Sequence, residues 1–164
     1  RVAHLAYQKK IEAESAKFIM VEDQGVGREH PLSGEKLSLV LTVYKVKDFD
    51  AAMAHTQNVL NYQGMGHSIG IHTNTPEHAT RLAEDLDVVR VLVNQAHTFG
   101  NGGSFNNGLN FALTMGCGTW AGNAISENLG YQHFINITHL VTTIPEDKPS
   151  EDDLFGGYWE KNGK

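Results

Sequence analysis

The sequence is poor in the features that define several classes of protein. Its single cysteine, Cys117, excludes an internal disulfide and favours a reducing compartment. No apolar run approaches the roughly 18 to 20 residues that cross a bilayer, and the first residues show no signal-peptide pattern. We therefore expect a cytoplasmic protein that has no membrane partner.

Basic residues are also few and scattered. The chain has 13 Lys and Arg against 19 Asp and Glu, which gives a net charge of −6. Binding to nucleic acid needs clustered Lys and Arg, so this balance argues against nucleic acid as the main partner. An anionic ligand would have to be held locally, by backbone amides or by single side chains.

Motifs for metal and phosphate binding are missing as well. The nine histidines include no H-x-x-x-H or H-x-H pair. His67 and His72 are five residues apart on one expected strand and so point to opposite faces. The run "GNGG" fits neither a P-loop nor a dinucleotide fingerprint, because a long loop follows the strand before it. We expect no metal site.

Alternating strand and helix patterns dominate the first part of the chain. The period of the apolar residues predicts an α/β fold, with a mainly parallel sheet and flanking helices, because strand–helix–strand order is typical of parallel pairs. Helices are expected at residues 2–16, 47–62 and 75–86, and strands at residues 17–22, 37–46, 64–73 and 87–94.

The amino-acid composition changes after Asn94. Residues 95–110, "QAHTFGNGGSFNNGLN", are rich in Gly and Asn and are read as a binding loop or as a surface loop. A short helix is expected at residues 124–130, "AISENLG", and a β-rich stretch at residues 134–144, "FINITHLVTTI". An acidic tail with an aromatic cluster closes the chain.

Three residues suggest chemistry, each with a structural alternative. Cys117 is framed by glycines, as a nucleophile would be, but no Lys or Arg lies between Asn94 and Gln132 to activate it, which favours a structural thiol in a tight turn. His67 follows "GMG" at the start of a strand, where a side chain would face a cleft. Glu35 precedes a buried strand, where a carboxylate can bind a ribose hydroxyl. Alternatively, the latter two are a structural histidine and an exposed loop residue.

Four segments together carry a resemblance to a known family. In order and spacing they resemble the later part of the aldehyde dehydrogenase superfamily, and its CoA-acylating branch most of all. The segments are "HPLSGEKLSLVLTVYKVKDFDAAM", "GMGHSIGIHT", "VRVLVN" and "LTMGCGTWAGNAISENLGYQHFINI". The resemblance implies that residues 1–142 form part of an aldehyde dehydrogenase catalytic domain, followed by an acidic tail at residues 143–164.

The resemblance also implies roles for single residues. The family's nucleophilic cysteine and its dinucleotide-binding domain lie upstream of these segments. Cys117 is then not the nucleophile, and this chain alone is expected to be inactive. Glu35 matches a cofactor-binding position at the nicotinamide ribose, and His67 matches a catalytic histidine. The expected aldehyde pocket is lined by His97, Thr98, Phe99 and Met115.

The implied reaction converts an aldehyde, coenzyme A and NAD or NADP into an acyl-CoA and NAD(P)H. A cysteine thiolate attacks the aldehyde, and the CoA thiol then resolves the thioester. The polar loop favours an aldehyde with an anionic tail, such as sulfoacetaldehyde or succinate semialdehyde. The superfamily pairs subunits near its C-terminus, so we expect a homo-oligomer, with residues 134–144 as a candidate strand.

Two alternatives stay open. A hydrolytic aldehyde dehydrogenase would use water in place of CoA, although His67 and "GCGTW" disfavour it. A non-catalytic module could keep the same fold for oligomerisation or ligand binding. An upstream segment with its own cysteine and a nucleotide-binding domain would distinguish a fragment of an enzyme from such a module.

Overall fold

The computed structural model describes residues 17–164, so the helix predicted at residues 2–16 lies outside the described part. The chain divides into two compact units, Arg1–His133 and Phe134–Lys164. The domain limit that we expect at residue 142 stays a prediction, and each unit is described by itself.

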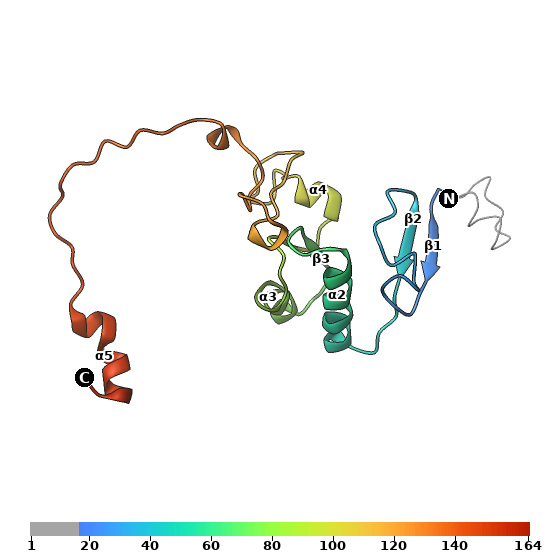
Figure 1. Ribbon diagram of the computed structural model, residues 1–164, viewed down its shortest axis with the longest axis horizontal. Coiled ribbons are helices and arrows are strands. Elements are labelled where there is room, and N and C mark those ends of the chain that lie inside the picture. The colour runs from blue at the N-terminus through green and yellow to red at the C-terminus, as the bar shows by residue number, and fades with distance from the viewer. Residues whose placement is uncertain (1–16) are drawn as a thin grey trace. The chain divides into compact units, whose positions relative to one another are not determined.

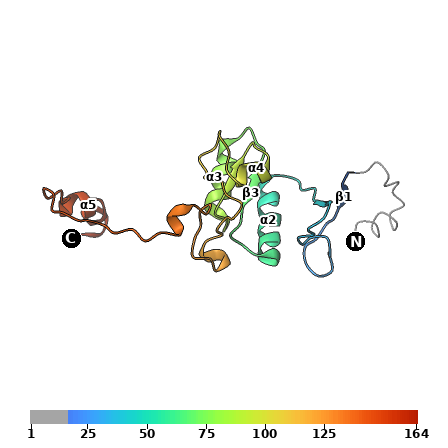
Figure 2. The same cartoon turned by 90° about the horizontal axis from the view of Figure 1, so that it is seen from above.

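The first unit has an α/β architecture, as the sequence predicts (Figure 1). Both views place α2, α3 and α4 around β3 (Figures 1 and 2). Its elements in chain order are β1 (Ile19–Glu22), β2 (Val40–Val43), α2 (Phe49–Gln63), β3 (Ile69–Ile71), α3 (Pro76–Asp85), β4 (Val91–Val93), α4 (His97–Asn101) and two 3-10 turns, Thr119–Ala121 and Tyr131–His133.

All strand pairs are parallel, but they form two small sheets instead of one. Strand β3 pairs with β4 across helix α3, with Ile69 opposite Val91, which is the predicted strand–helix–strand unit. Strand β1 pairs with β2, with Ile19 opposite Val40. The predicted α/β class is therefore confirmed, whereas the sheet is divided.

The long strand predicted at residues 37–46 is wrong in length and in burial. Strand β2 covers Val40–Val43, and Leu37, Leu39 and Leu41 are 90%, 66% and 53% exposed. A two-stranded sheet has one covered face, so alternate side chains of β2 face outward.

The main core lies between the β3–β4 pair and helices α2 and α3. It is built from Met53, Leu82, Leu86 and Val88, and fully burying one such side chain contributes about 1.5–3 kcal/mol. Helix α2, predicted at residues 47–62, begins at Phe49, because the Asp48 carboxylate caps it by accepting a hydrogen bond of 2.8 Å from the Ala51 amide. This core fixes the start of β3 and the end of β4, where the candidate site lies.

The helix predicted at residues 124–130 is wrong. This segment runs antiparallel to residues 115–118, with a bridge between Met115 and Asn128. The Gly116 amide donates to the Glu127 carbonyl at 2.9 Å, and the Gly118 amide donates to the Ile125 carbonyl at 3.0 Å. Because these carbonyls are already bonded across the turn, the segment cannot also form helical hydrogen bonds.

The second unit contains α5 (Glu151–Asn162). A capping box starts this helix, in which the Ser150 hydroxyl accepts from the Asp153 amide at 3.1 Å and the Asp153 carboxylate accepts from the Ser150 amide at 3.2 Å. The β-rich stretch predicted at residues 134–144 forms no strand in the described chain. Across the described residues, no helix combines the length and the apolar character that a bilayer crossing requires.

Candidate active site

A glycine turn places His67 at the start of β3. Gly66 has a φ of +104°, which favours glycine, and a Cβ there would lie 2.5 Å from the Cys117 carbonyl oxygen. Its amide donates to the Asp87 carbonyl at 2.7 Å, and its carbonyl accepts from the Val89 amide at 3.1 Å. The backbone before His67 is therefore held by close packing and by hydrogen bonds on both sides.

The structure brings His67 and His97 together through Ser68. The Ser68 hydroxyl lies 2.6 Å from His67 Nδ1 and 2.9 Å from His97 Nε2. Both histidines were predicted as site residues, but Ser68 was missed because Ser68 and His97 are 29 residues apart. Partial desolvation and then the nearby His67 lower the pKa of His97 below its usual range.

The other predicted pocket residues are less closely tied to this pair. Thr98 and Phe99 follow His97 on α4 and are exposed, with 79% of Phe99 accessible. Met115 lies in the bridge to Asn128. Within residues 17–164, no hydrogen bond or ring contact joins Thr98, Phe99 or Met115 to His67.

Glu35 is exposed, but its backbone is tightly held. Its amide donates to Gln63 Oε1 at 2.8 Å, at the end of α2. The neighbouring Lys36 ammonium donates to the carbonyls of Leu32 and Gly34, both at 2.7 Å, and to the Thr42 hydroxyl at 3.1 Å. Glu35 therefore presents a carboxylate on a fixed backbone, which fits the recognition of ribose hydroxyls.

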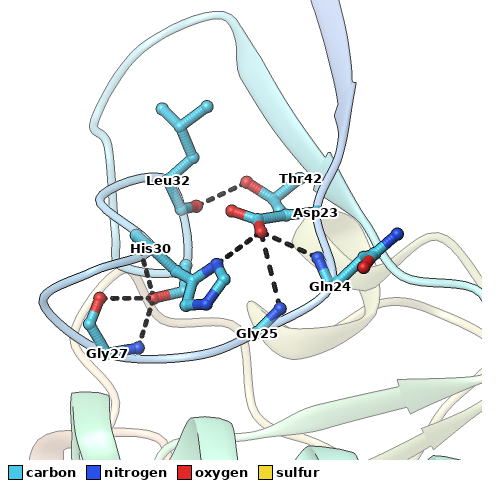
Figure 3. Close-up of polar contacts among 8 residues, drawn as sticks. Asp23, Gln24, Gly25, Gly27, His30, Leu32 and Thr42 are labelled. Atoms are coloured by element: carbon cyan, nitrogen blue, oxygen red, sulfur yellow. Dashed lines mark hydrogen bonds and ion pairs between the residues drawn. The ribbon is translucent and has the colours of Figure 1, made fainter.

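An acid–histidine pair orders the loop before Glu35 (Figure 3). The Asp23 carboxylate lies 2.7 Å from His30 Nδ1 and accepts from the Gln24 amide at 2.7 Å. The hydrogen bond from His30 and then that from Gln24 lower the pKa of Asp23. The Ser33 hydroxyl donates to the His30 carbonyl at 2.7 Å and so closes the loop.

Cys117 is half-buried in the turn that packs against Gly66, the residue before His67. Its amide donates to Asn123 Oδ1 at 2.9 Å, and its Sγ lies 3.9 Å from the Met115 carbonyl oxygen. Within the described chain, no basic side chain forms a hydrogen bond with Sγ. A cation does lie nearby, however, because Cys117 raises the pKa of Arg90 against the effect of burial. Arg90 lies 27 residues before Cys117 in the sequence, outside the stretch from Asn94 to Gln132.

Arg90 is a buried cation at the centre of the site. It is 6% exposed, and its Nε donates to Asn128 Oδ1 at 2.9 Å. Longer bonds of 3.4 Å run from its two Nη atoms to the carbonyls of His67 and Ser126. Burial lowers the pKa of Arg90, with Cys117 acting in the opposite direction. Sequence reasoning missed Arg90, although an arginine inside the apolar run "DVVRVLVN" was a signal of a buried, bonded cation.

Asn128 connects Arg90 to residues 95–110, which we call the glycine-rich run. It is 2% exposed, and its Nδ2 donates to the carbonyls of Asn101 and Asn110 at 3.0 and 2.7 Å. Within the run, Asn107 Nδ2 donates to the Gly100 carbonyl at 2.9 Å. The run also contains the short helix α4.

A cleft of about 740 Å³ opens between this run and the turn at residues 117–128. Its lining residues include Arg90, Asn110, Thr119, Trp120, Ser126 and Asn128. Of the groups described above, Arg90 and Asn128 line this cleft, whereas His67, His97 and Glu35 do not. Over residues 17–164, no group of three His, Cys, Asp or Glu side chains is placed to hold a metal ion.

Comparisons with known proteins give one consistent picture. A scan against protein-family models found no match. The chain is 48% identical, over all 164 residues, to a sulfoacetaldehyde dehydrogenase (acylating) of Cupriavidus necator, and it covers 33% of that protein. It is 38% identical to a succinate-semialdehyde dehydrogenase (acetylating) of Clostridium kluyveri, over 87% of this chain and 32% of the relative.

Solved structures agree with these relatives. An acetylating aldehyde dehydrogenase of Geobacillus thermoglucosidasius matches with a TM-score of 0.74 and 32% identity, over 88% of this chain and 32% of that one. A probable aldehyde dehydrogenase of Listeria monocytogenes matches with a TM-score of 0.77 and 31% identity, over 89% and 32%. The chain spans about a third of the length of the curated relatives that it matches.

Proposed function

The chain belongs to the family of acylating aldehyde dehydrogenases, and we propose on that basis that the protein to which it contributes is a CoA-dependent aldehyde dehydrogenase. The reaction takes an aldehyde, CoA and NAD(P)⁺ to an acyl-CoA, NAD(P)H and a proton. The observation that carries the proposal is the 48% identity to an acylating relative over all 164 residues. That similarity includes the segments that carry Glu35, His67 and Arg90.

His67 is assigned as the catalytic base of this reaction. A free thiol has a pKa of about 8.5 and a histidine about 6.5, so a positioned imidazole can take the thiol proton near neutral pH. His67 Nδ1 is occupied by Ser68, which leaves Nε2 for the reactants. The nucleophilic cysteine that forms the acyl intermediate comes from outside this segment.

Glu35 is assigned to the nicotinamide cofactor, whose chemistry is to accept two electrons from the aldehyde. The exposed carboxylate accepts hydrogen bonds from ribose hydroxyls, and Lys36 and Gln63 hold its backbone in place.

The substrate is assigned as an aldehyde with an anionic tail, sulfoacetaldehyde or succinate semialdehyde. Relatives with these two substrates in their names are 48% and 38% identical to the chain. His97, Thr98, Phe99 and Met115 stay the predicted pocket residues. Backbone amides and asparagine side chains of the glycine-rich run can donate hydrogen bonds to a sulfonate or a carboxylate.

A homo-oligomer in the cytoplasm completes the proposal. Residues 134–144 expose several large apolar side chains, which a second subunit would cover. These residues are Phe134, Ile135, Ile137, Leu140, Val141 and Ile144. Light scattering on the purified gene product gives the number of subunits, and a monomer at micromolar concentration would contradict this part.

The test of the proposed function is NAD(P) reduction by the complete gene product, with and without CoA, alongside its intact mass. Sulfoacetaldehyde, succinate semialdehyde and acetaldehyde are the trial substrates. We expect CoA-dependent reduction, fastest with an anionic aldehyde, from a polypeptide far heavier than 18.0 kDa. Reduction without CoA would indicate the hydrolytic reaction, and no turnover from an 18.0 kDa product would indicate a non-catalytic module.

A further inference from the structure

A hydroxyl lies between two imidazole nitrogens in the candidate site. Ser68 Oγ is 2.6 Å from His67 Nδ1 and 2.9 Å from His97 Nε2. Both distances are those of hydrogen bonds, so the three side chains form a continuous hydrogen-bonded chain. A serine hydroxyl has one proton to donate, so it accepts from one histidine while it donates to the other. The protonation of the two rings is thereby linked.

Two arrangements satisfy this chain when both rings are neutral. In the first, His67 carries its proton on Nδ1 and donates to Ser68, which donates to His97 Nε2. In the second, His97 carries its proton on Nε2 and donates to Ser68, which donates to His67 Nδ1. His67 Nε2 is a free base in the first arrangement and a proton donor in the second.

We propose that Ser68 and His97 are positioning residues that form a two-proton relay with His67, and that this relay switches His67 between base and acid. The catalytic use of the relay rests on the proposed function, because His67 is assigned there as the base. The linkage of the two rings through Ser68 does not depend on which reaction is catalysed.

The proton path balances as follows for one thiol deprotonation. His67 Nε2 takes the thiol proton and the ring becomes an imidazolium. Its Nδ1 proton passes to Ser68 Oγ while the Ser68 proton passes to His97 Nε2, which moves the positive charge to His97. His97 is exposed and releases its Nδ1 proton to water, which leaves both rings neutral in the second arrangement.

The surroundings of His97 keep its ring neutral before the proton arrives and favour release of the proton afterwards. Partial desolvation and then His67 lower the pKa of His97, so at neutral pH its ring is neutral and its Nε2 can accept. The nearby ionisable groups on the packed elements are Arg90, which donates to the His67 carbonyl, and Cys117, whose turn packs against the residue before His67. Arg90 therefore holds the backbone of His67, while the His67 ring bonds to Ser68.

Glycine in β3 provides room for the relay. A Cβ at Gly70 would lie 2.9 Å from His97 Nδ1, closer than real Cβ contacts, so a side chain there must displace the His97 ring. Gly70 has no positive φ, and alanine therefore fits the strand backbone itself. Gly70→Ala displaces His97 without touching the His67 ring or the serine hydroxyl.

The experiment compares Ser68→Ala, Ser68→Thr and Gly70→Ala in the complete gene product, with His72→Gln, directly after β3, as a control. Nitrogen-15 NMR of labelled histidines reports the tautomer of each ring. We expect Ser68→Ala to change the spectra of both His67 and His97, Gly70→Ala to do the same, and Ser68→Thr and His72→Gln to preserve them. Unchanged spectra in Ser68→Ala would overturn the relay.

Kinetics provide the second readout. Acid–base groups contribute about 10²- to 10⁴-fold to rate, so loss of the relay should lower kcat about 10- to 100-fold with little change in KM for the aldehyde. We expect Ser68→Thr to restore kcat. Unchanged kcat in Ser68→Ala would overturn the catalytic use. Linked spectra in a protein without CoA-dependent turnover would leave the relay standing and refute the proposed function instead.

Discussion

Arg90 donates its Nε–H to the side-chain oxygen of Asn128 at 2.9 Å, and both side chains are almost completely buried. The same asparagine donates to the carbonyls of Asn101 and Asn110. A single amide group therefore satisfies a buried cation and fastens the glycine-rich run to the turn at residues 117–128. Arg90 in turn donates to the His67 carbonyl, which connects this network to the catalytic candidate.

Asn128→Ala should destabilise the protein by about 3 kcal/mol or more, because each buried group left unpaired costs about 1–3 kcal/mol and a charged one more. Chemical unfolding of the complete gene product measures this loss of free energy. Asn61→Ala is the control, since that exposed amide accepts one bond from Gln57 within α2 and is worth about 0.2–0.5 kcal/mol. Equal effects of the two variants would contradict the role of Asn128.

Gly66→Ala should lower both stability and kcat. The residue has a φ of +104° and a Cβ would lie 2.5 Å from the Cys117 carbonyl oxygen. The left-handed backbone alone costs about 1–2 kcal/mol, and relief of the contact must shift either His67 or the turn. Gly108→Ala is the control, because a Cβ there meets no atom within 4 Å. Thermal unfolding should be affected by the first change and not by the second, and CoA-dependent rates should fall with the first.

The parts of the fold that follow local rules could be predicted from the sequence. The Asp48 cap begins α2, Pro76 begins α3, and the parallel pairing of β3 with β4 follows from the helix between them. These features depend on residues within one helix turn or on one short crossover, where periodicity and capping are informative.

The parts that depend on distant partners could not be predicted. Arg90 and Asn128 are 38 residues apart, and Ser68 and His97 are 29 residues apart. The helix predicted at residues 124–130 is absent because the carbonyls of Ile125 and Glu127 accept from the amides of Gly118 and Gly116, a pairing that local periodicity does not reveal. Glu35, His67 and His97 were singled out through the family resemblance, whereas their connecting groups were visible only in the structure.

Lys36→Met should weaken binding of the nicotinamide cofactor without abolishing the chemistry. The change removes three hydrogen bonds to Leu32, Gly34 and Thr42, and so frees the loop that presents Glu35. Hydrogen bonds from a charged group contribute about 1.5–3 kcal/mol each, so we expect KM for NAD(P) to rise about tenfold or more. Steady-state kinetics with varied cofactor provide the measurement. Lys45→Met, which removes an exposed ion pair with Glu22, should leave that KM unchanged.

Asp23→Asn should remove part of the acid sensitivity of the protein. The hydrogen bond from His30 lowers the pKa of Asp23 below its ordinary value of 3.8. A carboxyl with a lowered pKa stabilises the fold fully above that ordinary value, and its contribution is lost as the pH falls through the lowered one. The difference in Tm between wild type and Asp23→Asn should therefore be constant from neutral pH down to about pH 5 and shrink toward pH 2.

The matched control for Asp23 is Glu29→Gln, an exposed carboxylate in the same loop. Its Tm difference from wild type should not follow the same acid dependence, because within residues 17–164 no hydrogen bond or ion pair holds the Glu29 carboxylate as His30 holds Asp23. If Asp23→Asn and Glu29→Gln gave the same profile, the bond between Asp23 and His30 would not be what holds this loop. If the Tm difference shrank at acid pH for Asp23→Asn and not for Glu29→Gln, the Asp23 carboxylate would be the group that orders the loop before Glu35.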